Sequence, residues 1–246
     1  MSSPAPFVLT PDFGTQQSPI NIIDNRCFLT KHDAPEFSDE YSDIEVELRG
    51  EEGHRYFYVK GSQHVITVMT CGAAPLKATL KKIHFHAPSE HTIDGNYFDA
   101  EFHFVHEICK KNNHSGDGQI EPSDLLVVTL LASINSNAPN PLSIKEIANI
   151  MLQCAGEEPD DEKHSKVCGE LGEFIRDLID LSKSDSYFYR GSLTSGEYDE
   201  SVAWLIPKTP APITEESLKH LTELHIRQST RSIQPTNRRV ILKRAT

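Results

Sequence analysis

The feature of this sequence that most restricts its fold is a series of strand-like runs between residues 55 and 131. Each run is rich in aromatic and β-branched residues, and Gly, Pro, Asn or Asp separate it from the next. Runs joined in this way favour a large sheet whose neighbouring strands are mostly antiparallel, because short turns can connect them. The predicted strands are Arg55–Val59, His64–Met69, Leu76–His86, Tyr97–His106 and Leu125–Leu131.

Helix signals are confined to the second half of the chain. A capping box predicts a helix from Ser143, periodic apolar residues predict a second over Ser165–Leu181, and acidic residues predict a third from Thr214. The sequence therefore predicts one α+β domain over residues 1–246, predominantly β, with a large twisted sheet, a few peripheral helices and an irregular segment at 1–14.

The charge balance restricts the partners of such a domain. The chain carries 36 Asp and Glu against 24 Lys and Arg, a net charge of −12. This argues against a nucleic-acid or anionic membrane surface, which would need local positive potential. The longest apolar stretch, Leu125–Ala132, is too short to span a bilayer. Neither a nucleic-acid partner nor a membrane span is therefore expected.

The cysteines and the N-terminus bear on location. The five cysteines are widely spaced and contain no CxxC pair, so we expect reduced thiols rather than a disulfide framework or a cysteine zinc site. The first residues show no basic region followed by an apolar one, and thus no secretory signal. Both observations predict a cytoplasmic protein. A secreted mature chain and pairing of Cys154 with Cys168 remain alternatives.

Histidines are concentrated in residues 83–106. His84 and His86 are two positions apart on a predicted strand, so both imidazoles should project from the same face. His103 follows on the next strand-like run, and an antiparallel return would bring it beside the first pair. Three histidines with a fourth position left open are the arrangement of a catalytic zinc site.

Spacing alone leaves alternatives, because a His-x-His pair on a strand is more often a surface or core coincidence. Glu101 favours the metal site, since it shares the face of His103 and could accept the second N–H of a ligand imidazole. A structural zinc site would need a fourth protein ligand. His106 should face away from His103, and His91 looks like a hydrogen-bonding residue beside the site.

The run from His84 to His106 resembles the signature of the α-class carbonic anhydrases. Three further blocks resemble that family in the same order: Gln17–Ile22, Tyr189–Ser195 with Trp204 after it, and Gln234–Arg239. The four blocks extend from residue 17 to residue 239, which is nearly the whole chain. The resemblance implies the reversible hydration of carbon dioxide to bicarbonate and a proton, with sensitivity to sulfonamides. The expected partner is therefore this small-molecule substrate, and the expected form is a monomer or a weak homo-oligomer.

The resemblance also implies roles for particular residues. His84, His86 and His103 would hold Zn²⁺, which lowers the pKa of its bound water so that hydroxide can attack carbon dioxide. Thr194 would accept a hydrogen bond from that hydroxide and pass its own proton to Glu90. Without the resemblance, Glu90 would be read as an ordinary salt-bridge residue and Thr194 as a turn residue.

Further roles concern the proton and the substrate. His64 matches the proton-shuttle position of the family, although alone it would be read as a surface residue. Ser195 keeps a hydroxyl beside Thr194. The carbon dioxide pocket should be apolar because the substrate is uncharged. The matched pocket positions, which plain core packing would also explain, are Val105, Leu125, Val127, Leu193 and Trp204.

One departure from the family falls next to the metal ligands. Lys82 occupies a position where the family usually has glutamine, two residues before His84 and on the same face. An ammonium group offers only donors, so it cannot accept the N–H of His84. We therefore expect another acceptor for that ring, or a Lys82 side chain that turns toward water.

The alternative from another functional class is a non-catalytic carbonic-anhydrase-related protein that serves as a binding or adhesion module. Such relatives typically lose a metal-binding histidine, whereas all three are present here together with Glu90, Glu101 and Thr194. The acidic chain also lacks the basic face that a sulfated polysaccharide would require. The sequence therefore favours a zinc enzyme.

Overall fold

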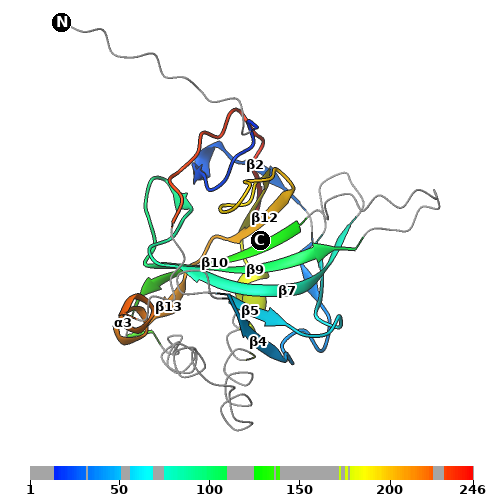
Figure 1. Ribbon diagram of the computed structural model, residues 1–246. Helices are drawn as coiled ribbons and strands as arrows, with labels where there is room; N and C mark the ends of the chain where they lie inside the picture. The colour runs from blue at the N-terminus through cyan, green and yellow to red at the C-terminus, as the bar shows by residue number, and fades with distance from the viewer. Residues whose placement is uncertain are drawn as a thin grey trace, which may run out of the picture.

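The computed structural model describes residues 14–31, 33–50, 56–68, 75–109, 125–135, 137–138, 172, 175–176, 178–223 and 230–245 (Figure 1). The expected irregular segment at 1–14 and the helix predicted from Ser143 lie outside these ranges, apart from Gly14. The strands are β1 (Asn21–Ile22), β2 (Phe28–Thr30), β3 (Glu36–Phe37), β4 (Val46–Arg49), β5 (Tyr56–Val59), β6 (Val65–Val68), β7 (Leu76–His86), β8 (Thr92–Ile93), β9 (Ala100–Ile108), β10 (Leu125–Ile134), β11 (Ser186–Gly191), β12 (Val202–Pro207), β13 (Ala211–Ile213) and β14 (Leu242–Arg244).

One 12-stranded sheet organises the molecule. Its strands follow the order β2-β14-β11-β12-β10-β9-β7-β5-β4, while β13 pairs with β10 and β6 links β3 to β7. Most pairs are antiparallel, but β10 runs parallel to β12 and β13, and β14 runs parallel to β2. The prediction of a large, mostly antiparallel sheet in a single α+β domain is therefore confirmed.

All five predicted strands are present, as β5, β6, β7, β9 and β10. The fourth begins at Ala100 rather than at Tyr97. The reason is a local turn, in which the N–H of Phe98 donates to the Ser89 hydroxyl and the N–H of Ser89 donates to the carbonyl of Phe98. Because the N–H and carbonyl of Phe98 are used in these hydrogen bonds, pairing with β10 begins only after this residue.

The helices are peripheral, as predicted. The helix α3 (Glu215–Glu223) is capped by Thr214, whose hydroxyl accepts the N–H of Ser217 at 3.0 Å. The described residues of the predicted 165–181 helix are helical too, and two of them, Ile175 and Leu178, are buried. A short 3₁₀ helix, η1, covers Asp24–Arg26. Within the described residues, no helix is long and apolar enough to cross a membrane.

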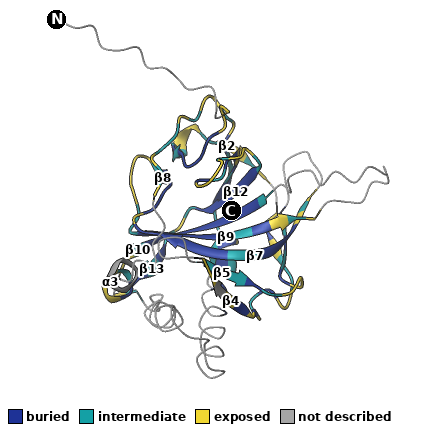
Figure 2. Cartoon of the chain, in the orientation of Figure 1, coloured by how far each residue is buried: buried dark blue, intermediate teal, exposed yellow. Residues whose placement is uncertain are grey.

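The central strands are buried on both faces (Figure 2). We call the two apolar clusters that cover them the larger core and the smaller core. Along β9, Phe102 and Phe104 belong to the larger core, whereas Val105 packs against the smaller core. The smaller core also contains Val127 and Trp204. Because side chains alternate along a strand, His103 projects on the side of the smaller core.

Candidate metal centre

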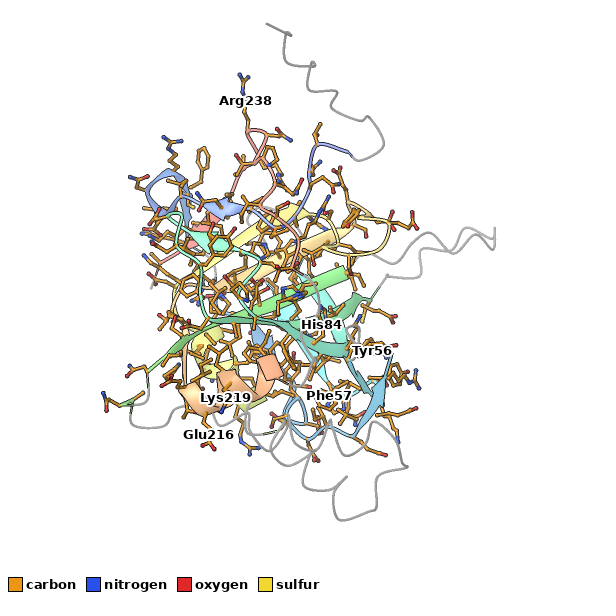
Figure 3. All side chains as sticks on the ribbon, turned by 60° about the vertical axis from the view of Figure 1, so that its left-hand side comes forward. Tyr56, Phe57, His84, Glu216, Lys219 and Arg238 are labelled. Carbon is orange, nitrogen blue, oxygen red and sulfur yellow. The ribbon has the colours of Figure 1, made fainter. Side chains whose placement is uncertain are left out.

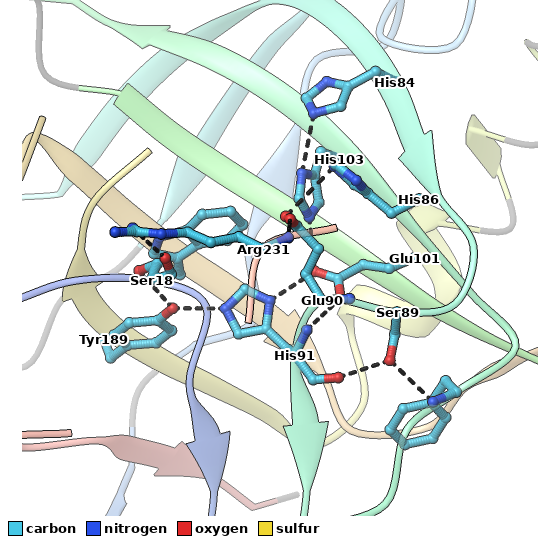
Figure 4. Close-up of polar contacts among 12 residues, drawn as sticks. Ser18, His84, His86, Ser89, Glu90, His91, Glu101, His103, Tyr189 and Arg231 are labelled. Atoms are coloured by element: carbon cyan, nitrogen blue, oxygen red, sulfur yellow. Dashed lines mark hydrogen bonds and ion pairs between the residues drawn. The ribbon is translucent and has the colours of Figure 1, made fainter. Parts of the chain in front are cut away.

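Three histidine side chains converge on the smaller-core side of β7 and β9, as the sequence predicts. His84 pairs directly with His103 across the two strands, and His86 lies two residues further along β7. His84 Nε2 and His103 Nδ1 are 3.1 Å apart, as Figure 4 shows. One nitrogen from each of the three rings lies within 4.8 Å of the others. All three residues are buried.

This donor set suits zinc. Burial, followed by the neighbouring rings for His84, lowers the pKa values of His84 and His103, so both imidazoles stay neutral. Neutral imidazole nitrogens are ordinary zinc ligands, and three of them leave a position free at a tetrahedral ion. Without a metal, one of the two facing nitrogens of His84 and His103 can donate to the other, and with the His84 proton on Nδ1 both present lone pairs to an ion. The residues therefore fit a divalent metal.

No fourth protein ligand joins this group among the described residues. His106 projects into the larger core, where Nε2 lies 2.5 Å from the Tyr41 hydroxyl and Nδ1 bonds the carbonyl of Leu126. His91 donates to Glu101 and meets the hydroxyl of Tyr189 at 2.6 Å. His106 thus faces away from His103, as the alternation along the strand predicts. His91 is a hydrogen-bonding residue beside the site, as the sequence pattern predicts.

Glu101 orients one ligand ring. Its Oε1 accepts from His103 Nε2 and from His91 Nδ1, each at 2.7 Å. Its Oε2 accepts the backbone N–H groups of Glu90 and His91. Burial alone would raise the pKa of Glu101, but the hydrogen bonds from His103 and His91 hold it well below its ordinary value. Glu101 is therefore an ionised acceptor that fixes the His103 ring.

Glu90 and Thr194 lie in contact beside the histidines. Glu90 is fully buried, and its Oε1 accepts the backbone N–H of Arg231 at 2.8 Å. A hydrogen bond from the Thr194 side chain also reaches this carboxylate. Burial and the charge of Glu101 nevertheless raise the pKa of Glu90 to about 8. Glu90 Oε2 lies 3.5 Å from His86 Nε2, so the pair adjoins the metal centre.

Arg231 is a positioning residue that the sequence analysis missed. Besides holding Glu90 through its backbone, its guanidinium donates to Gln17 Oε1 and to the carbonyl of Ser18, each at 2.8 Å. It also stacks over the ring of Tyr198, 3.7 Å from the ring centroid. Arg231 thus ties the N-terminal block to the loop after Thr194. A lone basic residue outside the matched blocks carries no local signal of this role.

The expected substrate positions are grouped in one place. The ring centroid of Trp204 lies 5.1 Å from that of His103 and 4.7 Å from that of His91. Ser195 is exposed, next to Thr194. The apolar positions all belong to the smaller core or pack against it: Val105, Leu125, Val127, Leu193 and Trp204.

His64 does not lie at the metal centre, contrary to the expectation of a proton shuttle. The N–H of Leu80 donates to the carbonyl of His64, which extends the β6–β7 pair to these two residues. Cross-strand partners project from the same face, and Leu80 belongs to the larger core. His64 is fully buried, with Nδ1 bonded to the carbonyl of Glu40. A shuttle must exchange protons with water, so this position does not suit one.

Lys82 lies on the ligand face, and its ammonium group contacts an aromatic ring. Lys82 Nζ is 4.3 Å from the ring centroid of Tyr56 on β5 (Tyr56 and His84 are labelled in Figure 3). Burial lowers the pKa of Lys82. His84 Nδ1 is buried and has no hydrogen-bond partner among the described residues. Neither expected outcome is observed: the described residues provide no acceptor for His84 Nδ1, and Lys82 packs on Tyr56 instead of turning toward water.

The sequence profile of one family, described as eukaryotic-type carbonic anhydrase, matches residues 10–245. The chain belongs to this family. Carbonic anhydrase 7 from Homo sapiens is 26% identical over 244 residues, which cover 93% of this chain and 88% of that protein. The carbonic anhydrase of Pectobacterium carotovorum is 28% identical over 245 residues, covering 95% and 84%.

A solved structure supports the fold assignment. The α-carbonic anhydrase of Thermovibrio ammonificans, in complex with sulfanilamide, superposes with a TM-score of 0.64 at 22% identity. The match covers 95% of this chain and 92% of that one. At this identity the likeness shows the carbonic anhydrase fold alone, and the chemistry must be argued from the residues of this chain.

Proposed function

We propose that this protein is a zinc-dependent carbonic anhydrase that interconverts carbon dioxide and bicarbonate. The convergence of three buried imidazoles beside the Glu90–Thr194 pair carries the proposal. His84, His86 and His103 would hold the ion. Bound there, Zn²⁺ would lower the pKa of water enough to supply a nucleophile near neutral pH. Uncharged ligands leave the charge of the ion undiminished for that purpose.

Glu90 and Thr194 would orient the reacting water. In its ionised form, which a bound divalent cation would favour, the Glu90 carboxylate accepts a hydrogen bond from the Thr194 hydroxyl, so the Thr194 oxygen remains free to accept a hydrogen bond. A reacting group that donates to Thr194 has its remaining lone pairs directed elsewhere, toward the substrate. The backbone of Arg231 holds Glu90 in place for this contact. Such orientation supplies part of the rate by limiting the geometries that the reacting groups explore.

The smaller core would receive the substrate. Carbon dioxide is uncharged and weakly hydrated, so an apolar wall suits it better than a polar one. Trp204, whose ring contacts that of His103, and Val127 in the same core supply that wall, and Leu193 immediately precedes Thr194. A bicarbonate product is charged and would leave such a wall readily.

Metal analysis combined with stopped-flow hydration of carbon dioxide tests this function. The purified protein should contain about one zinc per chain and should hydrate carbon dioxide, and a sulfonamide should inhibit it. Removal of the metal should abolish turnover, and added zinc should restore it. A well-folded protein that binds no zinc and has no activity would contradict the proposal and favour a binding module.

A further inference from the structure

The two paired ligand histidines differ in what contacts the ring nitrogen that points away from the metal centre. His103 Nε2 donates to Glu101, which stands two residues earlier on β9. On β7, the residue two positions before His84 is Lys82. The equivalent ring nitrogen, His84 Nδ1, is buried and has no partner among the described residues. The same spacing on adjacent strands thus gives one oriented ring and one ring without such a contact.

The chemistry of Lys82 explains the difference. Glu101 shows that a side chain at this two-residue spacing can reach the neighbouring imidazole, in that case at 2.7 Å. The ammonium group of Lys82 is only a donor, and the N–H of His84 is also a donor, so the two cannot form a hydrogen bond. The ammonium group instead contacts the ring of Tyr56 on β5. Tyr56 lies two residues before Tyr58, which is the partner of Lys82 in the pairing of β5 with β7.

The charge of Lys82 acts in the same direction. Lys82 lies two residues before His84 on β7, and His84 pairs with His103 on β9. A positive charge at this position would repel a divalent cation held by the two histidines. The missing acceptor leaves His84 poorly oriented, and the ammonium group opposes the charge of the metal.

We infer that Lys82, which packs on Tyr56, weakens the binding of the metal by His84. The site therefore has a lower zinc affinity than its three ligands would otherwise provide. Partners that orient a metal-ligating histidine typically contribute 10- to 100-fold to affinity. This inference rests on the proposed zinc site. It predicts that an acceptor at position 82 tightens zinc binding.

Zinc titration of the apoprotein against a chromophoric chelator tests the inference. Lys82→Gln supplies an acceptor and should tighten binding by about 10- to 100-fold. Lys82→Met removes the charge without supplying an acceptor and should tighten binding less. Lys81→Gln is the matched control, because Lys81 donates to the carbonyl of Gly61 and its loss should leave the affinity within about twofold.

A second readout separates orientation from charge. In the zinc-loaded protein, Lys82→Gln should show one more exchange-protected imidazole N–H proton by NMR than the parent, whereas Lys82→Met should not. Lys82→Glu, which copies the Glu101 arrangement, provides a second acceptor should the glutamine variant fold poorly. Thermal unfolding of each apoprotein identifies any variant whose fold has changed.

The outcomes are distinct. Equal zinc affinity for the parent and both acceptor variants would overturn the inference while leaving the proposed function intact. Equal tightening by Lys82→Gln and Lys82→Met would overturn the role of the missing acceptor. If neither the parent nor any variant binds zinc, the proposed function fails together with the inference.

Discussion

Buried histidines lie on both faces of the central sheet, and their surroundings differ. On the smaller-core face, the ring nitrogens of His84 and His103 point toward each other. On the larger-core face, His106 bonds a tyrosine hydroxyl and a backbone carbonyl, and His64 bonds a backbone carbonyl. Burial by itself therefore does not identify a metal ligand. What distinguishes the two faces is whether the nitrogens meet one another or meet other polar groups.

Replacing one histidine on each face by alanine should produce the largest difference in zinc binding and in activity. His103→Ala removes a metal ligand, and we expect zinc binding to be lost and carbon dioxide hydration to fall by at least about 1000-fold, because the nucleophile depends on the metal. His106→Ala, three residues away, should retain zinc and activity at temperatures where it is folded. Metal analysis and stopped-flow kinetics measure both. Loss of zinc from the His106 variant would contradict the claim that only the smaller-core face holds the metal.

Within the smaller-core face, two neighbouring hydroxyls provide a finer test. Thr194→Ala should lower kcat/KM by about 100-fold, since it removes a donor to Glu90 and an acceptor for the reacting group. Ser195→Ala should change kcat/KM by less than about threefold, because Ser195 is exposed. Zinc content should be normal in both. Equal losses in the two variants would remove the assigned role of Thr194.

On the larger-core face, His106 should contribute to the pH dependence of stability. Burial lowers the pKa of His106 from 6.5 to about 4. An unfolded chain binds a proton at this residue below pH 6.5, whereas the native state does so only near pH 4. Stability present at neutral pH is therefore lost as the pH falls through this window, by at most about 3.5 kcal/mol at roughly 1.4 kcal/mol per pKa unit.

Urea unfolding at pH 7 and pH 4 measures this loss. His106→Gln keeps a polar side chain that does not titrate, so the free energy of unfolding should fall less over the same interval than in the parent. The difference between the two proteins isolates His106 from other titrating groups. Identical pH dependence would contradict the assignment of a neutral, buried His106.

The smallest expected effect concerns His64. If this residue belongs to the larger core, His64→Ala should leave turnover in weak buffer within about twofold of the parent, since a buried ring bonded to Glu40 cannot exchange protons with water. A modest loss of stability is expected from the cavity and the lost hydrogen bond. A fall in turnover that added imidazole rescues would restore the shuttle role and contradict the observed placement.

Much of the metal centre could be predicted from local pattern. Side chains alternate along a strand, so His84 and His86 had to share a face, and the turn before β9 had to return His103 toward them. The same rule separated His103 from His106. The relation between Glu101 and His103 also follows from a two-residue spacing. These predictions need only the period of a strand and one turn.

Other features depended on contacts between distant segments. Residues 231 and 90 are far apart in the sequence, and the role of Arg231 exists only because its backbone reaches Glu90. The stacking of Lys82 on Tyr56 requires β5 to pair with β7. The matched segment around His64 did not reveal which face that side chain would occupy.

Hydrophobic alternation and turn residues act over a few positions, so the large β-sheet and the shared face of three histidines follow from local pattern. Which of the buried histidines meet depends on how distant strands pair. Along β7, a register shift between Leu80 and Lys82 places Leu80 in the larger core although both are an even number of residues from His84. Such a shift arises from pairing with β9, so strand period alone cannot locate it.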